Sequence, residues 1–499
     1  MNCSKLKLRI VFVVGVSILF AGCTDSYTER DETYQVIEEE SQTVEEPEQE
    51  EEFQIAEEIE EEEERHRWWR YDIVQFRDHT LALHPKFADE DLMDLSHNVE
   101  LRSTFEESVD ALLAAVPELT DFEIEVGLQT TVALLQDNHF FFGEDIGTES
   151  FFMFLLEERY PLIFGWFADG WYLYQSHEDA SDALNHRLIA INDTPLEDVF
   201  EAFTTFWSLE NIYDARDRFA RVLNAPLVLK ALGVTDESQT TYTFIDDSEE
   251  TLEITLTDTT RSTASFAGDD NVLPDEQLTD QRQAGELPLF LQDPPLGQEH
   301  YYGFWYDFAE QHSHWYDFIE EDGILYIRFN IYLYPITEDY LIDFEQALQD
   351  VFIEYEVEAV IIDARGNSGG DERGFQPLFQ WLAEEMPSGR LFYFVNEGSR
   401  SGSLLAADYL YQLGAIIVGQ PLGQATDFYA WGESTISDPS TWYTYLTYSG
   451  RRFSLPNVFH SMHTSEDGVF RPHILIEYTI DDWIYNRDPL YDHVLNLLQ

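Results

Sequence analysis

A buried strand that runs into a glycine-rich turn is the first segment of the sequence whose residues could do chemistry. It reads AVIIDARGNSGGDE over residues 359–372. Paired glycines after a strand let the backbone turn and present its N–H groups with no side chain in the way. Such N–H groups can bind an anionic oxygen. The residues of this motif are Asp363, Arg365, Asn367, Gly369 and Gly370.

A serine at a predicted strand-to-helix junction is the second such feature. The segment VNEGSRSGSLLAADYL covers residues 395–410 and places Ser401 where the helix should begin. A hydroxyl there lies near helix N-terminal N–H groups that can stabilise a developing oxyanion, so Ser401 is a candidate nucleophile. The alternative is a helix N-cap, because serine is favoured at that position in its own right. The glycine motif upstream favours the nucleophile.

Together these segments resemble the serine peptidases of the C-terminal-processing (tail-specific) and tricorn-core group. The resemblance covers most of the chain beyond Arg65 and is most specific in the last third. The order of its motifs is most similar to that of bacterial lipoprotein members of the group. The motifs are Asp137-Asn138-His139, Tyr326-Ile327-Arg328-Phe329-Asn330, Asp363 to Gly370, Ser401, IIVGQP (416–421) and Asn486-Arg487-Asp488-Pro489.

The resemblance implies a role for each residue of the serine and glycine motifs. Ser401 matches the nucleophile of the family's Ser-x-Ser element, and Ser403 matches its second serine. The backbone N–H groups of Gly402 and of Gly369 or Gly370 match the oxyanion hole. The reaction implied is hydrolysis of peptide bonds in a polypeptide substrate through an acyl-enzyme, and no cofactor is expected.

The base that activates the serine departs from the pattern of the processing members. These use a lysine downstream of the serine, whereas here residues 419–434 read GQPLGQATDFYAWGES and no lysine follows Lys230. The remaining route is that of the tricorn-like members, in which a histidine from an N-terminal segment takes the proton. His139 matches that element, and a histidine with an unperturbed pKa of ~6.5 suits the task. The alternative for His139 is a capping or core histidine at a helix end.

The acid that would orient the base is not fixed by spacing. Glu433 in Trp431-Gly432-Glu433 is the first candidate and Asp137 the second, although either could be a solvated carboxylate. No metal-ligand spacing is present. His312 and His314 lie two residues apart without a third ligand nearby in sequence, so we expect them to pack with the surrounding aromatic residues.

Residues 1–22 have the pattern of a lipoprotein signal peptide. A basic start precedes an apolar stretch that is short for a membrane span and typical of a signal sequence. The ending LFAGC resembles a bacterial lipobox, which implies that Cys23 is acylated and anchors the exported protein to the outer face of a bacterial cell membrane. The alternative is a plain secretory signal with an incidental cysteine.

The charge of the chain is strongly negative. There are 98 acidic and 27 basic residues, which gives −71 at pH 7 and excludes nucleic acid as an expected partner. Residues 38–64 hold 16 glutamates and no basic residue. Self-repulsion predicts a disordered stretch there, so residues 23–64 should form an acidic tether between the anchor and the folded body.

The folded body should contain a helical domain, a small α+β module and an α/β catalytic domain. Apolar residues at three- and four-residue spacing predict helices in residues 65–149. Residues 150–258 resemble a peptide-binding PDZ-like module, although a simple structural insert explains them equally well. A polar linker covers 259–315. Alternating strands and helices in 316–499 predict a sheet covered by helices, and the family resemblance implies a crotonase-like ββα core.

Three functions remain open from the sequence. The first is a membrane-tethered serine peptidase that acts on exported polypeptides. The second is a binding protein that has kept the peptidase fold and lost turnover. The third follows from the resemblance of the core to the crotonase fold, whose members bind acyl-CoA, but the expected location outside the cytoplasm argues against it. Fold analogy alone does not choose among these.

Overall fold

The computed structural model describes two compact units, Met1–Glu60 and Glu61–Gln499. The described residues are 48–89, 92, 95–142, 158–236, 238–246, 248–257, 262–263, 280–283, 287–292, 313–332, 338–431, 443–462 and 467–499. Within these ranges, no helix combines the length and the apolar character that crossing a membrane requires. The proposed signal peptide and Cys23 lie outside the described residues.

The first helix differs from the expectation for the acidic segment. Helix α1 covers Glu48–Leu83, so the part of the predicted tether from residue 48 to residue 64 is helical, and residues 38–47 lie outside the described residues. Glutamate has a good intrinsic helix propensity, and acidic side chains near a helix N-terminus interact favourably with its dipole. The prediction of disorder weighed the mutual repulsion of the glutamates and neglected both effects.

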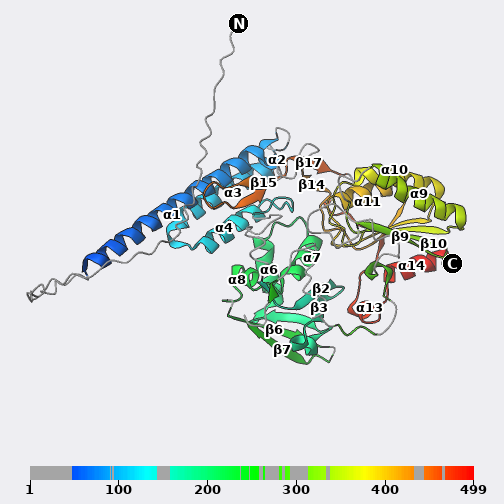
Figure 1. The fold of residues 1–499 in the computed structure, drawn as a ribbon, viewed down its shortest axis with the longest axis horizontal. Coiled ribbons are helices and arrows are strands. Elements are labelled where there is room, and N and C mark those ends of the chain that lie inside the picture. Colours follow the sequence, from blue (N-terminus) through cyan, green and yellow to red (C-terminus); the bar gives the residue numbers. More distant parts are fainter. Residues whose placement is uncertain are drawn as a thin grey trace, which may run out of the picture. The chain divides into compact units, whose positions relative to one another are not determined.

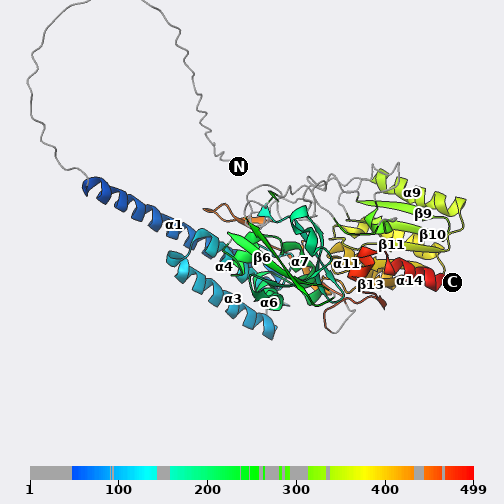
Figure 2. The ribbon, with the colours of Figure 1, turned by 90° about the horizontal axis from the view of Figure 1, so that it is seen from below.

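The helices that follow α1 form the first part of the second unit. They are α2 (Pro85–Ala88), α3 (Ser96–Ala115), the short η1 (Val116–Glu118) and α4 (Asp121–Ala133). Helices α3 and α4 run side by side (Figure 2). Thr120 and Glu123 form a capping box at the start of α4, which satisfies N–H groups that the helix leaves free. After α4 the chain enters the loop that carries His139.

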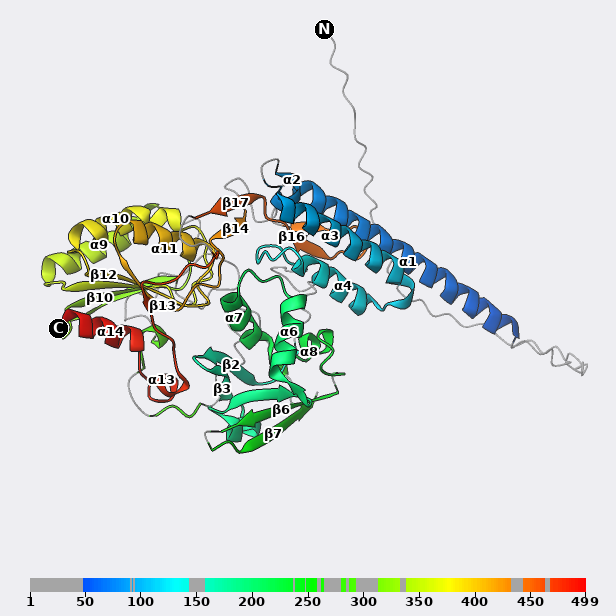
Figure 3. The same cartoon turned by 180° about the vertical axis from the view of Figure 1, so that it is seen from behind.

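An antiparallel sheet with helices packed on it forms the next part (Figure 3). The strand order is β2-β3-β4-β6-β7, and the predicted hairpin at Asp169-Gly170 joins β2 to β3. The predicted turn at Asn192-Asp193 follows β4, with both residues at positive φ. The elements are β2 (Leu162–Phe167), β3 (Gly170–Ser176), η2 (Glu178–Ala183), β4 (Arg187–Ile191), β5 (Thr194–Pro195), α6 (Leu196–Phe206), α7 (Ile212–Val222), α8 (Pro226–Ala231), β6 (Gln239–Ile245) and β7 (Thr251–Thr257).

The helical part and the sheet part share one hydrophobic core. Phe76 of α1, Phe105 of α3, Phe203 of α6 and Tyr242 of β6 are fully buried in the same cluster. The boundary that the sequence suggested near residue 150 therefore does not separate two cores. The short strands β1 (Glu158–Arg159) and β8 (Ser262–Thr263) pair with each other beside this part.

A six-stranded mixed sheet forms the last part of the chain (Figure 1). Its order is β18-β13-β12-β11-β10-β9, and all neighbours are parallel except β9 and β10. The strands are β9 (His314–Ile319), β10 (Ile324–Phe329), β11 (Ala359–Asp363), β12 (Leu391–Val395), β13 (Ile416–Gly419) and β18 (Ile474–Leu475). Alternation of strands and helices predicted this mixed α/β architecture, and the prediction is confirmed at that level.

Helices cover both faces of this sheet. On one face lie α9 (Glu338–Glu354), α10 (Gln376–Glu385) and α11 (Gly402–Gln412), and on the other lies α14 (Pro489–Leu498) (Figure 1). Every residue of the central strands β10, β11 and β12 is buried, as expected when both faces are covered. Three short elements, η5 (Leu289–Leu291), η6 (Glu372–Phe375) and α13 (Ile480–Ile484), lie in the connections.

Two small hairpin-like pairs complete the fold. Strand β14 (Asp427–Ala430) pairs with β17 (Val458–Ser461), and β15 (Tyr443–Tyr445) pairs with β16 (Arg452–Ser454). The second pair reaches the loop after α4, where Phe142 forms an isolated bridge with Phe453. The segment that carries His139 is therefore attached to the C-terminal part of the chain.

Candidate active site

Ser401 lies between β12 and α11 in a strained backbone conformation. Its φ is 48° and its ψ is −120°, a combination that a residue with a side chain rarely adopts. Ser401 occupies the N-cap position, but its side chain makes no capping hydrogen bond to α11. Its Oγ instead lies 3.2 Å from Nε2 of His139. The hydroxyl is thus directed to the imidazole, and the N-cap alternative does not account for it.

His139 lies in the loop that follows α4, and the structure brings it to Ser401 from 262 residues away in the sequence. Its main-chain N–H donates to Oδ1 of Asp137 at 2.9 Å. The ring packs on Phe428 at a centroid distance of 5.9 Å and edge-on to Trp431 at 5.3 Å. Nδ1 of His139 is buried and has no hydrogen-bond partner among the described residues.

Burial lowers the pKa of His139 to about 4, and the negative charge of Asp137 opposes this shift only in part. The imidazole is therefore neutral at and around neutral pH. A neutral ring can accept the proton of Ser401 at Nε2, as a general base must. A carboxylate at Nδ1 would stabilise the imidazolium that forms, and the described residues place no hydrogen-bonded carboxylate there.

Asp137 holds the main chain of His139 and not its ring. Its Oδ1 accepts the His139 N–H, and its Oδ2 lies 3.0 Å from Nε2 of His84. His84 and Asp137 are both fully buried, and burial lowers the pKa of His84. The second candidate for the orienting acid thus fixes the path of the loop. The first candidate, Glu433, lies outside the described residues.

The glycine turn after β11 approaches the serine so closely that side chains would not fit. A Cβ on Gly370 (φ 102°) would lie 1.5 Å from the carbonyl oxygen of Tyr332, and one on Gly402 would lie 2.2 Å from the carbonyl oxygen of Gly370. A Cβ on Gly369 (φ 116°) would lie 2.6 Å from Cβ of Ser401. Glycine is therefore required at each position of this contact.

The structure distinguishes the glycines that the sequence left open for the oxyanion hole. The N–H of Gly369 already donates to Oδ1 of Asn367 at 2.9 Å. Within the described part of the chain, the N–H groups of Gly370 and Gly402 donate to no protein acceptor. Gly370 is exposed, whereas Gly402 is buried at the start of α11. These two N–H groups can therefore receive an oxyanion, whereas that of Gly369 cannot without losing Asn367.

The charged residues of the glycine motif form a buried ion network beneath the turn. Asp363 accepts from the Tyr326 hydroxyl at 2.7 Å and from Nη1 of Arg328 at 2.9 Å. Arg365 binds Asp363 and also Oδ2 of Asp488, at 2.8 Å. Burial alone would raise the pKa of Asp363, but Arg365 and Arg328 outweigh it and lower that pKa to about 2. Asp363 and Arg365 thus support the turn and take no place beside the hydroxyl.

Ser403 and Asn367 also have supporting positions. Oγ of Ser403 is fully buried and lies 3.2 Å from the hydroxyl of Tyr393. Nδ2 of Asn367 donates to the carbonyl of Phe329 at 3.1 Å. The main-chain carbonyl of Asn367 accepts the N–H of Arg400 at 3.0 Å. The second serine of the motif therefore faces the core, and Asn367 joins the glycine turn to the residue before Ser401.

Sequence analysis missed Glu210 and Gln424, which lie next to the reactive pair. Oε1 of Gln424 accepts the main-chain N–H of Ser401 at 2.9 Å, and Nε2 of Gln424 donates to Glu210. Burial, together with the charge of Asp137, raises the pKa of Glu210 well above its usual value. Neither residue belongs to a recognisable motif, and they are 214 residues apart, so no local signal could have found them.

Three donor atoms of this region lie close enough to hold a metal ion, which the sequence did not suggest. One atom each from Asp137, His139 and Glu210 lies within 4.8 Å of the others. Both oxygens of Asp137 and both of Glu210 already accept hydrogen bonds from the protein. The hydrogen bonds therefore account for this cluster. Of the two histidines noted in the sequence, His312 lies outside the described residues and His314 packs on Phe344, at 4.4 Å, as expected.

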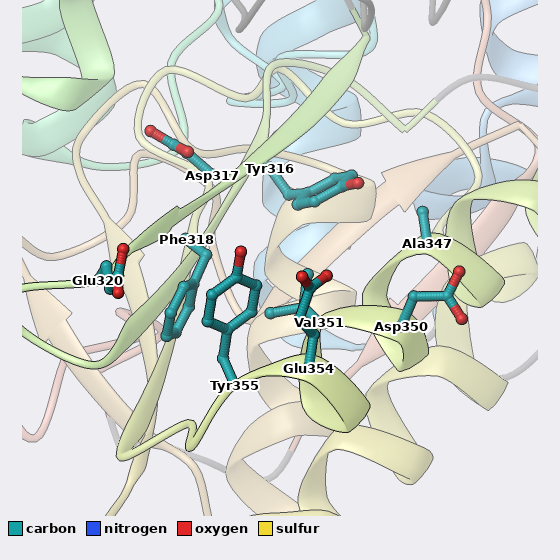
Figure 4. Close-up of a pocket in the computed structure, with 9 residues that line it drawn as sticks. All are labelled: Tyr316, Asp317, Phe318, Glu320, Ala347, Asp350, Val351, Glu354 and Tyr355. Atoms are coloured by element: carbon teal, nitrogen blue, oxygen red, sulfur yellow. The ribbon is translucent and has the colours of Figure 1, made fainter.

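A groove of about 400 Å³ between β9 and α9 is separate from this site (Figure 4). Carboxylates and aromatic rings line it, among them Asp317, Asp350, Glu354, Tyr316 and Tyr355. It shares no residue with the serine, the histidine or the glycine turn. Among the described residues, no serine, cysteine or histidine lines the groove, so its lining lacks the hydroxyl–imidazole pair found at Ser401 and His139.

Comparison with known proteins finds relatives by structure only. No family model and no curated protein matches the sequence. The structure of mature CPAF complexed with lactacystin matches with a TM-score of 0.52 at 14% identity, over 87% of this chain and 98% of that one. A second structure of mature CPAF gives 0.50 at 14% identity, over 86% and 96%. A photosystem II D1 C-terminal processing protease covers 86% and 97% at 11% identity with a TM-score of 0.35. The two CPAF structures show that the chain shares the fold of mature CPAF.

Proposed function

We propose that the protein is a serine peptidase that hydrolyses polypeptides through an acyl-enzyme, with Ser401 as nucleophile and His139 as base. The observation that carries the proposal is the 3.2 Å contact between Oγ of Ser401 and Nε2 of His139. It joins two motifs that lie 262 residues apart and that the family resemblance had separately assigned to these roles. A hydroxyl, a neutral imidazole and N–H groups free to bind an oxyanion are the parts that acyl transfer needs.

The geometry gives each group one task in the reaction. As Oγ of Ser401 attacks the carbonyl carbon of a peptide bond, Nε2 of His139 takes the hydroxyl proton. The N–H groups of Gly370 and Gly402 donate to the oxyanion that forms. The imidazolium returns the proton to the leaving amine, which departs and leaves an ester on Ser401. Water then attacks the ester with His139 again as base, and the acid product leaves.

The wider assignments are part of the same proposal. The mixed sheet is a crotonase-like core, and the antiparallel sheet with α6 is a PDZ-like module that would bind an extended chain end. Cys23 is the lipidated residue, which would hold the enzyme on the outer face of a bacterial cell membrane. Replacing Cys23 with Ala should release the protein from the membrane fraction. Retention after a salt wash would contradict the anchor and leave the peptidase assignment untouched.

Covalent labelling tests the chemistry without knowledge of the physiological substrate. A fluorophosphonate probe should label the parent protein at one site, identified as Ser401 by peptide mapping, and should not label Ser401→Ala. Ser403→Ala is the matched control, because Ser403 is a buried serine on the same helix that makes no contact with His139. Labelling that persists in Ser401→Ala would overturn the proposal.

A second function is favoured by one specific observation. The Nδ1 atom of His139 has no partner among the described residues, so the base is less supported than in a complete triad. A binding lipoprotein that keeps the peptidase fold without turnover would tolerate such a base. A parent protein that neither reacts with the probe nor cleaves denatured polypeptides would favour this function.

A further inference from the structure

The carboxyl group of Glu210 contacts the loop that carries His139 and the loop that carries Gln424, whose amide in turn contacts Ser401. Glu210 lies between α6 and α7, so it belongs to neither of those segments. Its Oε1 accepts the main-chain N–H of Asn138, the neighbour of His139, at 3.2 Å. Its Oε2 accepts the main-chain N–H of Ala425 at 2.7 Å. One side chain therefore joins the loop of the base to the loop that flanks the nucleophile.

Gln424 extends this connection to the nucleophile itself. Its Nε2 donates to Oε2 of Glu210 at 2.5 Å, and its Oε1 accepts the main-chain N–H of Ser401 at 2.9 Å. Because the main-chain N–H of Ser401 can only donate, the amide of Gln424 presents its oxygen to Ser401 and its Nε2 to Glu210, whose two oxygens also accept main-chain N–H groups. The strained backbone of Ser401 needs such an outside partner, since this conformation persists only where the surroundings enforce it.

The residues beside Glu210 make further contacts with the same two loops. Oγ of Ser208 donates to the carbonyl of Asp137 at 2.7 Å and accepts its N–H at 3.0 Å. On the other side, Nδ2 of Asn211 donates to the carbonyl of Leu422 at 3.1 Å. Residues 208–211 (the strip 208–211) are thus hydrogen-bonded to both loops. Within the strip, Glu210 contacts the neighbour of His139 and also Gln424, which contacts Ser401.

Helix α7 also holds the residue immediately before the nucleophile. Arg400 binds Oδ1 of Asp214 at 2.8 Å and Oδ2 of Asp217 at 2.6 Å. All three side chains are largely buried, so these pairs are weakly screened by solvent. The start of α7 therefore fixes the position of the serine turn, and this gives Glu210 a rigid base from which to act.

We propose that Glu210 is a positioning residue that sets the geometry between Ser401 and His139, with Gln424 as its link to the serine. This proposal rests on the proposed peptidase function of the same site. Glu210 takes no proton from the substrate and does not touch the reacting atoms. Its effect comes from alignment, and misplacing a catalytic group by 1 Å can lower the rate by about 10²-fold.

Replacement of Glu210 by Gln separates alignment from packing. An amide has one accepting end, so Glu210→Gln can retain the bond to Asn138 or the bonds to Gln424 and Ala425, but not both. The shape of the side chain is preserved. The matched control is Glu125→Gln, because Glu125 is a buried glutamate that likewise joins distant segments, through Arg451, and lies outside the site.

Glu210→Gln should lower the rate of fluorophosphonate labelling of Ser401 by about 10²-fold. With a polypeptide substrate the loss should fall on kcat, with KM near that of the parent. Glu125→Gln should label at the parent rate even if it melts earlier. Should Glu210→Gln fail to fold, Gln424→Met removes the link to the serine at similar volume and should show the same loss. Parent rates in a folded Glu210→Gln or Gln424→Met would overturn the proposal.

A double-mutant cycle with the base gives a second and sharper result. In a His139→Ala background there is no base to align, so Glu210→Gln should cost far less than the hundredfold seen in the parent. An equal loss in both backgrounds would show that Glu210 acts only through general stability. The double variant Glu210→Gln with Gln424→Glu should recover part of the rate. In it the amide at position 210 can donate to the carboxylate at position 424, so the hydrogen bond between the two positions is restored with donor and acceptor exchanged.

A parent protein without activity would contradict the proposed peptidase function but would not test the positioning role of Glu210. For that case the ¹⁵N signals of the His139 ring provide a readout that needs no turnover, assigned by their loss in His139→Ala. Glu210→Gln should shift them, and Glu125→Gln should leave them in place. Ring signals that do not move in Glu210→Gln would overturn the positioning role, whether or not the parent is active.

Discussion

The serine and the histidine of the site are held by different means. Ser401 lies at the start of α11, in the connection from β12. The glycine turn packs against it without space for a side chain, and the buried network of Asp363 and Arg365 supports that turn. His139 lies in a loop outside the sheet, and among the described residues only its Nε2 has a hydrogen-bond partner on the ring. The nucleophile is therefore fixed by the fold, whereas the base is fixed by contacts between distant segments.

This difference locates the place where function is most easily changed. A change in the glycine turn beside Ser401 disturbs a closely packed region, so it should cost stability together with activity. A change near His139 alters a few hydrogen bonds and ring contacts, so it should cost activity with little loss of stability. An active peptidase and an inactive binding protein could therefore differ only on the side of the base.

Removal of either reactive side chain should have the largest effect. Ser401→Ala and His139→Ala should each lower kcat on an unstructured polypeptide by a factor on the order of 10⁴ to 10⁶, because they act as one unit. The double variant should be scarcely slower than either single one. Melting temperatures should stay near that of the parent. Full activity in His139→Ala would show that another group is the base, and the contrast between Ser401 and His139 would then no longer hold.

A Cβ at Gly370 should have the next largest effect, on the side of the nucleophile. Gly370→Ala places a methyl group against the carbonyl of Tyr332 and disturbs a proposed oxyanion donor. We expect a loss of about 10² to 10³ in kcat and of about 1–3 kcal/mol in stability. Gly366→Ala is the control, since Gly366 lies in the same turn at φ 73° but has no atom within 4 Å of a Cβ. Equal effects of the two variants would remove the steric argument.

The buried ion network should affect stability more than chemistry. Asp363→Asn leaves Arg328 and Arg365 with an uncompensated charge and should cost about 3–5 kcal/mol of unfolding free energy. Because the pKa of Asp363 is lowered to about 2, its contribution is present above the unfolded value of ~3.9 and is lost as the pH falls towards 2.

The control for the ion network is a second Asp–Arg pair that lies at the surface. Asp467→Asn removes an exposed pair with Arg471 and should leave the melting temperature nearly unchanged. Activity of Asp363→Asn should fall only with the folded fraction, measured at a temperature where the variant is still native. A kcat loss in fully folded Asp363→Asn would show that the network also aligns the serine.

The dependence of kcat/KM on pH should show the smallest effect, and it distinguishes a histidine that acts alone from one that a carboxylate supports. Because His139 has a pKa of about 4 in the folded protein, kcat/KM should rise with pH through about 4 and then stay level. The unfolded histidine titrates near ~6.5, so the stability linked to this residue is lost as the pH falls from there to 4. An acidic limb near 6.5 that moves down in Glu433→Gln would show that Glu433 supports the base.

The sequence predicted the strands and helices of the last third because their patterns are local. The run from Ala359 to Asp363 is apolar enough to be a strand buried on both faces, and the pattern after Gly402 is that of a helix packed on one side. The helix from Glu48 escaped prediction, since its glutamates show no apolar face. Local repulsion was visible in the sequence, but helix propensity outweighed it.

The site could be predicted only where a motif marked it. Ser401 and His139 were expected to meet because each matches a family element, and no physical property of the sequence brings them together. Glu210 and Gln424 carry no such mark, because they belong to no motif and lie 214 residues apart in the sequence. The choice between Gly369 and Gly370 needed the hydrogen bond from Gly369 to Asn367, which depends on the turn geometry.

The distribution of the site along the chain has a consequence for how the protein is made. The base near residue 139, the strip 208–211 and the serine at 401 meet only through contacts between distant segments, and such contacts form late because long loops must close first. The network below the glycine turn also needs Asp488, close to the last residue. During synthesis, therefore, Ser401 has no base beside it until the chain has folded. If the protein is a peptidase, it should therefore not cleave its own unfolded chain before folding is complete.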